Sequence, residues 1–461
     1  MILNEIANYI INTSYENIPH EDISKAKLCF TDYLGVTMRG FYDTPPQIIL
    51  KTLEPFKKDT ISQVSIIGFK GNNYLNEIDS AFLNGVSAHT LDLDDGHKLG
   101  QIHPGAIVFS TAIAISQKHD LTSKEFLESV IIGYDIGIIL STLVNPNHRN
   151  QGFHTSGTIG TFISGAVTAK LLKFDKKEII NTLGLCGTQS SGLLESNHTG
   201  SMAKPLHIGR SVSNGILSAY LAKNGLTGSE YIFEGKEGFV NGMSAKTQIN
   251  TEFFNKFKKN INKHHIREVY HKLYPFCRHI HSSIDSALNI KKYIIENNIR
   301  LNEIKNININ TYSITCQHNN FKPKNPQELR QSLPMAVALT IIYSSPNLNL
   351  INKLINNNLF QYSNTELNLL LNKINIKYDE NIEKEFPLKR ISNIELNTYN
   401  NKSFNSITEY SKGECENPLN TNDIIKKFKE INPKYDIEKL NIIKNMEDYK
   451  INNVINKINK V

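Results

Sequence analysis

The feature that most constrains the fold of this chain is a change in residue pattern near residue 266. Before that point, apolar and small residues form long runs typical of buried helices, as in 104–116, 157–172 and 208–224. After it, apolar and polar residues alternate, which predicts strands, in four segments: 307–314, 373–378, 391–399 and 404–410.

Helical patterns interrupt and follow this alternating region, at 329–343, 422–431 and 436–458, and Asn400-Asn401 is placed as a hairpin turn. One helical domain with an α+β domain inserted near its end explains this order better than three independent domains. We therefore predict a mainly α fold with three parts: 1–265, the main part of a large all-helical domain; 266–411, a smaller α+β domain; and 412–461, helices that return to the helical domain.

Composition narrows the classes of partner and compartment. The net charge is +7, but the basic residues are spread out, so we expect no nucleic-acid partner and instead a field that attracts polycarboxylates. The five cysteines are scattered without a CxxC pair, which favours a reducing compartment. No signal peptide is apparent in 1–12, and the apolar stretch 130–144 contains Asp135 and looks too short to span a bilayer. We predict a cytoplasmic protein that does not bind membranes.

Titratable side chains are crowded into three short polar motifs within apolar segments. They are 89–97 running on to His103-Pro104-Gly105, then 152–155, then 202–207. Burying such groups is unfavourable unless they pair with one another or with a charged ligand. Carboxylate, imidazole and ammonium groups together are what proton transfer on an anionic substrate needs, so the motifs indicate an active site.

The acidic run 92–95 allows several interpretations. A calcium loop fails, because the twelfth position counted from Asp92 is His103 and not Glu. The letters also match the DxDD acid of a terpene cyclase, but the chain has no Trp to line such a cavity. Asp92, Asp95, His97 and His103 are plausible metal ligands, and a polar loop that caps the next helix is the plainest alternative. We favour a metal-free site in which Asp92 orients a histidine and His103 moves a proton.

His154 and Lys204 each stand at the start of a predicted helix. A histidine there is often a cap or a satisfied core group, and a lysine there is often exposed. Lys204 opposes the helix macrodipole, however, and a carboxylate bound between it and the helix N-terminus would turn this conflict into an anion site. Gly157 and Gly160 follow no strand, which argues against a dinucleotide loop.

The segment 274–281 holds a further group of candidates. Cys277 beside histidines could be a nucleophile, but no acyl-transfer constellation accompanies it. Arg278 and His281 are better candidates for closing over an anionic ligand.

Taken in order, these motifs resemble the MmgE/PrpD family, and the resemblance runs almost end to end. Each piece is weak alone, but their order and spacing are specific. They are Asp32-Tyr33-Leu34-Gly35, the DLDDGH…HPG segment, Gly133-Tyr134-Asp135, Phe153-His154, Ala203-Lys204-Pro205-Leu206-His207-Ile208-Gly209, YPFCRHIHSSID, and Asn417-Pro418-Leu419.

The resemblance implies that the smaller domain is a lid, that the site lies between the domains, and that the protein is a homodimer without cofactor or metal. Family members include 2-methylcitrate dehydratase, cis-aconitate decarboxylase and iminodisuccinate epimerase. Carried over by motif, the catalytic positions are Asp92, His103, His154 and Lys204. The predicted substrate-binding residues are Gly96, His97, His207, Arg278 and His281.

Two departures qualify the likeness to the decarboxylase. Gly96 stands where the decarboxylase has a threonine, and no tyrosine falls in 316–318, where its lid tyrosine is expected; Tyr312 is the nearest. We therefore predict a lyase or an isomerase/epimerase that acts at the carbon alpha to a carboxylate of a di- or tricarboxylate. The alternatives are a hydro-lyase of the 2-methylcitrate or citrate type, and a non-catalytic carboxylate-binding protein.

Overall fold

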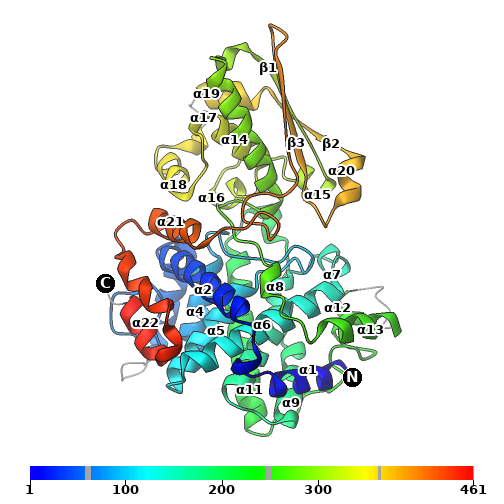
Figure 1. Ribbon diagram of the computed structural model, residues 1–461, viewed down its shortest axis with the longest axis vertical. Coiled ribbons are helices and arrows are strands. Elements are labelled where there is room, and N and C mark those ends of the chain that lie inside the picture. The colour runs from blue at the N-terminus through cyan, green and yellow to red at the C-terminus, as the bar shows by residue number, and fades with distance from the viewer. Residues whose placement is uncertain (58–63, 245–250, 362–364, 460–461) are drawn as a thin grey trace. The chain divides into compact units, whose positions relative to one another are not determined.

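The computed structural model describes residues 1–57, 64–244, 251–361 and 365–459. The chain divides into two compact units: unit 1 comprises 1–195, 202–270 and 420–461, and unit 2 comprises 196–201 and 271–419. The blue N-terminal and red C-terminal helices of Figure 1 both belong to unit 1. The predicted mainly α fold, built from both chain ends with a smaller sheet-containing region, is confirmed.

The regular secondary structure in the described residues of unit 1 is helical. Its α-helices are α1 (Ile2–Asn12), α2 (His20–Gly40), α3 (Thr44–Leu53), α4 (Glu77–His89), α5 (Pro104–Lys118), α6 (Ser123–Val144), α7 (Asn147–Asn150), α8 (Thr155–Leu171), α9 (Lys176–Thr188), α11 (Ala203–Lys223), α12 (Phe239–Met243), α13 (Thr251–Asn260), α21 (Thr421–Ile431) and α22 (Ile451–Asn459). Helix α8 packs against α5, α6, α9 and α11 and is buried except at Lys170, so it forms the centre of the unit.

Small residues let the central helices approach closely. A Cβ placed on Gly215 of α11 would lie 2.4 Å from the Ser164 Cβ atom and 2.6 Å from the Gly165 nitrogen of α8. Only glycine fits at such a contact, which explains the Gly/Ala/Ser bias of both helices. Capping boxes, whose pattern is visible in the sequence, begin α6 at Thr122 with Glu125 and α9 at Asp175 with Glu178.

Helix α6 extends beyond the apolar stretch 130–144 at its N-terminal end. At 22 residues it is the one described helix long and apolar enough to cross a membrane, but 89% of its apolar window is buried in the protein. Buried Asp135 lies in this helix and is satisfied by neighbouring groups of unit 1. The burial is that of a core helix.

Unit 2 contains a four-stranded sheet in the order β2-β1-β3-β4. The strands are β1 (Ile304–Thr311), β2 (Ile374–Tyr378), β3 (Ser392–Thr398) and β4 (Ser403–Thr408); β1 pairs parallel with β2 and antiparallel with β3, which forms a hairpin with β4. Its helices are α10 (Ser196–Thr199), α14 (His281–Glu296), α15 (Ser313–Cys316), α16 (Pro326–Leu329), α17 (Leu333–Tyr343), α18 (Leu348–Asn356), α19 (Thr365–Leu371) and α20 (Glu380–Glu385). Helix α14 lies along the sheet and contacts β3, β4 and α17 (Figure 1).

Several predicted elements are wrong in extent. The helix predicted at 329–343 begins at Leu333, because the Ser332 hydroxyl caps it there, and Leu329 ends the separate short helix α16. The strand predicted at 307–314 ends at Thr311, because the Ser313 backbone N–H and hydroxyl both donate to the Glu383 carboxylate and a short helix begins there. The helix predicted at 436–458 is broken, because the Ile451 N–H donates to the Leu121 carbonyl and Tyr449 accepts from the Ser123 N–H. Those backbone groups are therefore used across the fold and cannot continue a helix.

Candidate active site

Four helix ends bring most of the predicted side chains together within unit 1. Helix α4 ends at His89, α5 and α8 begin directly after His103 and His154, and α11 carries Lys204 in its first turn. His103 and His154 occupy N-cap positions, but neither side chain caps its helix, so a capping role is excluded. Because α5, α8 and α11 present their N-termini here, the helix dipoles favour an anion at this place.

The imidazole rings form a continuous row. Ring centroids are 4.7 Å apart for His89 and His103, 5.7 Å for His89 and His154, and 5.2 Å for His154 and His207. The Nδ1 atoms of His154 and His207 are 3.1 Å apart. The structure thus joins three predicted residues, and it adds His89, which the sequence motif contained but which we had not placed in the site.

Asp94 is the carboxylate that faces the histidines. Its Oδ2 atom lies 2.8 Å from His89 Nδ1 and 3.5 Å from His103 Nδ1, and His103 Nδ1 is also 2.7 Å from the Asp95 carbonyl oxygen. A ring nitrogen this close to a carbonyl must carry the proton, so Nδ1 of His103 donates and Nε2 is its basic nitrogen. We had assigned the orienting role to Asp92, and the structure gives this contact to Asp94.

Asp92 pairs with Lys204 instead. Its Oδ2 atom lies 3.2 Å from the Lys204 Nζ atom, and both side chains are largely buried. Asp92 has a φ of +51°, in the left-handed region that non-glycine residues adopt at a cost. This turn directs the first carboxylate of the acidic run to the lysine and the second to the histidines.

Asp95, the third carboxylate of the run, is held on the opposite side by the helical core. The Gly105 N–H donates to Oδ1 at 3.0 Å, and the Tyr134 hydroxyl donates to Oδ2 at 2.5 Å. Burial raises the pKa of Asp95 to about 7, although the hydrogen bond from Tyr134 acts in the opposite direction. Tyr134 was visible in the Gly133-Tyr134-Asp135 motif, but no local signal pointed to its partner.

The buried histidines resist protonation. Burial, then the charges of His89, His207, Lys204 and His103, holds the pKa of His154 well below its usual range. Burial, then His89 and Lys204, lowers the pKa of His207 to about 4. Both rings are therefore neutral near pH 7 and able to accept a proton. Negative charge brought beside them would raise their pKa towards the range of an effective base.

Gly96 and His97 lie beside this row and contact other groups. A Cβ on Gly96 would lie 2.4 Å from the Tyr270 hydroxyl, so this glycine is required by the approach of the tyrosine. The Gly100 N–H donates to His97 Nδ1 at 3.0 Å, and His97 Nε2 lies 3.2 Å from the Glu268 carboxylate. His97 also lines a separate hollow of about 260 Å³ with Glu268 and His265.

Arg278 and His281 belong to unit 2 and contact each other. The guanidinium of Arg278 pairs with the Glu414 carboxylate at 2.8 Å, and its Nη1 atom donates to His281 Nδ1 at 3.0 Å. His281 Nε2 then donates to the Phe276 carbonyl oxygen at 3.2 Å. These contacts fix His281 as a neutral imidazole, because one of its nitrogens accepts and the other donates.

His89, Asp94 and His103 also meet a simple geometric criterion for a metal site, since one ligand atom from each lies within 4.8 Å of the others. Metal binding needs a lone pair on each ligating nitrogen. The nitrogen of His103 that faces Asp94 carries a proton and donates to the Asp95 carbonyl oxygen. His103 Nδ1, the nitrogen nearest Asp94, therefore has no lone pair to offer a metal ion.

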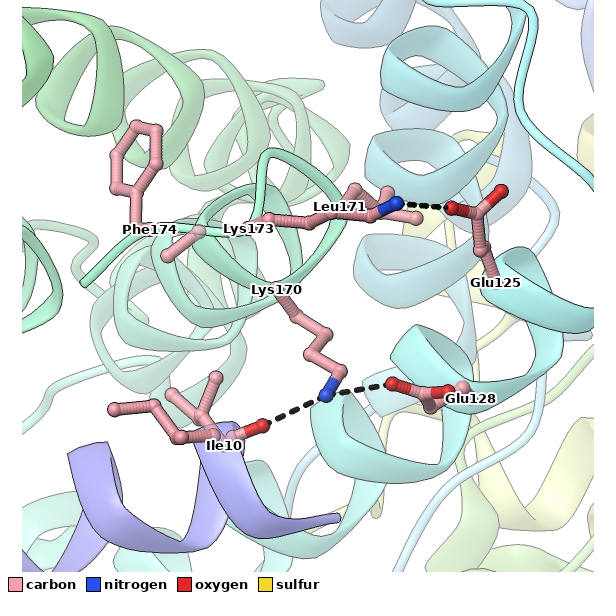
Figure 2. Close-up of a pocket in the computed structure, with 9 residues that line it drawn as sticks. Ile10, Glu125, Glu128, Lys170, Leu171, Lys173 and Phe174 are labelled. Carbon is pink, nitrogen blue, oxygen red and sulfur yellow. Dashed lines mark hydrogen bonds and ion pairs between the residues drawn. The ribbon is translucent and has the colours of Figure 1, made fainter. Parts of the chain in front are cut away.

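A hollow of about 420 Å³ elsewhere in unit 1 is lined by α1, α6 and the end of α8 (Figure 2). Lys170 donates to the Ile10 carbonyl oxygen at 2.9 Å and pairs with Glu128, while Lys173 pairs with Glu125 at 2.9 Å. The two lysines offset two carboxylates, and Lys170 caps the end of α1. This hollow is part of the packing between helices.

Comparison with known proteins identifies the fold. Residues 4–252 match the MmgE/PrpD N-terminal domain, and residues 274–448 match the MmgE/PrpD C-terminal domain. The chain belongs to the MmgE/PrpD family. The resemblance drawn from the sequence motifs is thereby confirmed.

Curated relatives within the family are enzymes and share about a fifth of their residues with this chain. The cis-aconitate decarboxylase of Homo sapiens is 21% identical over 438 residues, which cover 92% of this chain and 88% of that protein. The cis-aconitate decarboxylase of Aspergillus terreus is 22% identical over 344 residues, covering 70% of this chain and 67% of the relative. A cis-aconitate decarboxylase-like protein, oryM of Aspergillus oryzae, is 22% identical over 242 residues.

The match to oryM spans about half of each protein, 51% of this chain and 49% of oryM. The family match itself covers both MmgE/PrpD domains and includes every residue of the histidine row. Membership of the family thus explains the fold, and it places the chain in a broad group of enzymes that act on carboxylates.

Proposed function

We propose that this protein is a cofactor-independent acid/base enzyme that acts at the carbon alpha to a carboxylate of a small di- or tricarboxylate. The observation that supports this most is the row of four imidazoles beside the Lys204–Asp92 pair, at the meeting of three helix N-termini. Removing a proton or a carboxyl group at such a carbon leaves a carbanion, which needs a nearby cation and a proton donor.

In the proposed mechanism, neutral His154 is the base. Its depressed pKa keeps it unprotonated until a polyanionic substrate binds. Lys204 and the helix N-termini bind the substrate carboxylates and stabilise the enolate that forms. His103 is the acid: its Nδ1 proton is held by the Asp95 carbonyl oxygen beside Asp94, and in the protonated ring Nε2 carries the second proton, which it supplies.

The reaction type depends on how the substrate carbon lies between His103 and His154 and on whether it carries a leaving group. Two histidines on opposite faces of the carbon support racemisation or epimerisation, and one base with a leaving group supports elimination. Decarboxylation, the activity named for the relatives, is disfavoured by Gly96, whose place for a side chain is filled by the Tyr270 hydroxyl. Tyr312 offers no substitute for a lid tyrosine, because it is fully buried and bonded to His279 at 2.8 Å.

The proposal includes a homodimer in the cytoplasm that uses no metal or cofactor and binds neither nucleic acid nor membranes. Size-exclusion chromatography with light scattering tests the dimer. Activity after exhaustive treatment with a chelator, together with elemental analysis of the active protein, tests the metal. Restoration of lost activity by an added divalent ion would overturn the metal-free mechanism.

The substrate class is tested with a panel of di- and tricarboxylates followed by NMR in deuterated water. Deuterium at the alpha carbon without loss of substrate identifies racemase or epimerase chemistry, and release of carbon dioxide or water identifies a lyase. A new C=C absorbance with 2-methylcitrate would instead favour the hydro-lyase. Binding of carboxylates without exchange or turnover would identify a non-catalytic carboxylate-binding protein.

A further inference from the structure

His89 is a buried histidine of the imidazole row that the mechanism above does not use. It is 1% exposed, ends α4, and lies with its ring between those of His103 and His154, the two groups assigned to proton transfer. A residue placed between a base and an acid is positioned to carry a proton from one to the other.

The hydrogen bonds of His89 are asymmetric. Its Nδ1 atom lies 2.8 Å from the Asp94 Oδ2 atom, which fixes the proton on that nitrogen. Within the described part of the chain, Nε2 is enclosed and has no hydrogen-bond partner. Leaving a buried polar atom without a partner is unfavourable, and native proteins seldom keep one without a use.

A purely structural histidine of the same unit provides the contrast. His148 is also fully buried, but its Nδ1 lies 3.0 Å from the Met243 carbonyl oxygen and its Nε2 lies 2.7 Å from the Thr158 hydroxyl. Both of its nitrogens are engaged, as expected of a ring that only holds the fold together. His89 keeps a basic nitrogen available inside the row of imidazoles.

We propose that His89 is a proton relay between His154 and His103, which resets the site after each turnover; this rests on the acid/base function proposed above. The C–H bond breaks, its electron pair enters the enolate, and its proton goes to His154. His103 then gives its proton to the carbanion. The proton on His154 passes to His89 Nε2, and the same nitrogen then gives it to His103 Nε2, which lost its proton to the carbanion, so the protein ends each cycle unchanged.

The surrounding charges favour this direction of transfer. His154 faces Lys204, His207, His89 and His103, all of which oppose a proton on its ring. His89 Nδ1 and His103 Nδ1 lie 2.8 Å and 3.5 Å from the Asp94 Oδ2 atom. The relay therefore leads from a ring that faces a lysine to two rings that face a carboxylate.

The test compares His89→Gln with His148→Gln, the same change at a buried histidine outside the site. His89→Gln should lower kcat by about 10-fold to 100-fold, leave KM nearly unchanged, and recover rate when imidazole is added, because a soluble base replaces the relay. His148→Gln should lose stability, keep the kcat of the folded enzyme and show no rescue. Thermal unfolding of both variants separates loss of fold from loss of relay.

Two results would overturn the relay. A wild-type kcat in His89→Gln would overturn the relay. The proposed function would still stand if the wild type turns over a carboxylate and His103→Ala does not. The second result is a loss of kcat in His89→Gln that imidazole does not restore and that accompanies a fall in thermal stability like that of His148→Gln. His89 would then have a structural role only. If the wild type acts on no di- or tricarboxylate, the proposed function fails and the relay fails with it.

Discussion

Two buried clusters of unit 1 pair a carboxylate with histidines, and they differ in how completely their polar atoms are used. In the first, Asp135 accepts from the Tyr9 hydroxyl and the His265 N–H, and its Oδ2 lies 2.8 Å from His264 Nδ1. In the second, Asp94 faces His89 and His103, and His89 Nε2 has no partner among the described residues.

Adjacent residues of α6 serve the two clusters. Tyr134 donates to Asp95 beside the histidine row, while Asp135 holds α1 and the 264–265 segment. The difference teaches that burial and charge alone do not mark an active site. A carboxylate surrounded by donors stabilises the fold, whereas a row of imidazoles that keeps basic nitrogens available is suited to moving protons.

The largest expected effect removes the reacting groups of the second cluster. His103→Ala and His154→Ala should each lower kcat/KM by about 10²-fold to 10⁴-fold, because the proton donor or acceptor is lost. Circular dichroism should show a folded protein in both cases. Wild-type turnover in either variant would remove that histidine from the mechanism.

The next largest effect is expected in the first cluster, where a substitution should lower stability and leave activity unchanged. Asp135→Asn should cost about 3 kcal/mol of unfolding free energy, because breaking a buried charged pair leaves His264 and the Tyr9 hydroxyl poorly matched. Activity of the folded protein should stay near that of the wild type. Urea denaturation with parallel activity assays measures both, and lost activity at unchanged stability would exchange the roles of the two clusters.

Asp95, beside the second cluster, should make the stability of the protein depend on pH. Its pKa is raised by burial from 3.8 to about 7, so the folded state holds a proton that the unfolded state has released across that range. Stability should therefore fall as pH rises from about 4 to about 7 and then level off. Asp95→Asn removes this pH-dependent contribution. In urea denaturation, the unfolding free energy of the variant relative to that of the wild type should therefore increase as pH rises over the same range. Parallel curves for the two proteins would contradict the raised pKa.

The smallest effect is expected at His97, which we had predicted to bind substrate. Its two ring nitrogens lie against Glu268 and the Gly100 N–H. His97→Gln should therefore leave kcat/KM close to the wild-type value in steady-state assays. A rise in KM without a change in kcat would restore His97 to the substrate site.

Much of the helical fold was predictable because its signals are local. Capping boxes at Thr122 and Asp175 and the apolar run after His103 identify helix starts without reference to distant residues. The helix predicted at 436–458 failed because Tyr449 and Ile451 bond to residues 121–123, a pairing that no local pattern encodes.

The candidate site followed the same rule. The places of His103, His154 and Lys204 were predictable because each precedes or opens a helix in a polar motif. The division of labour among Asp92, Asp94 and Asp95 was not predictable, because it depends on the left-handed turn at Asp92 and on Tyr134 from α6. His89 was passed over because, in sequence, it is only the last residue of a helix.

The central claim is that His103 and His154 exchange protons with carbon next to a carboxylate. Proton NMR of each candidate di- or tricarboxylate in deuterated water, with wild type, His103→Ala and His154→Ala side by side, tests it most directly. We predict that the wild type introduces deuterium at the alpha carbon of one substrate or its product, and that both variants lose this exchange. Exchange that continues in both variants, or a wild type that binds a carboxylate and never exchanges its protons, would contradict the account.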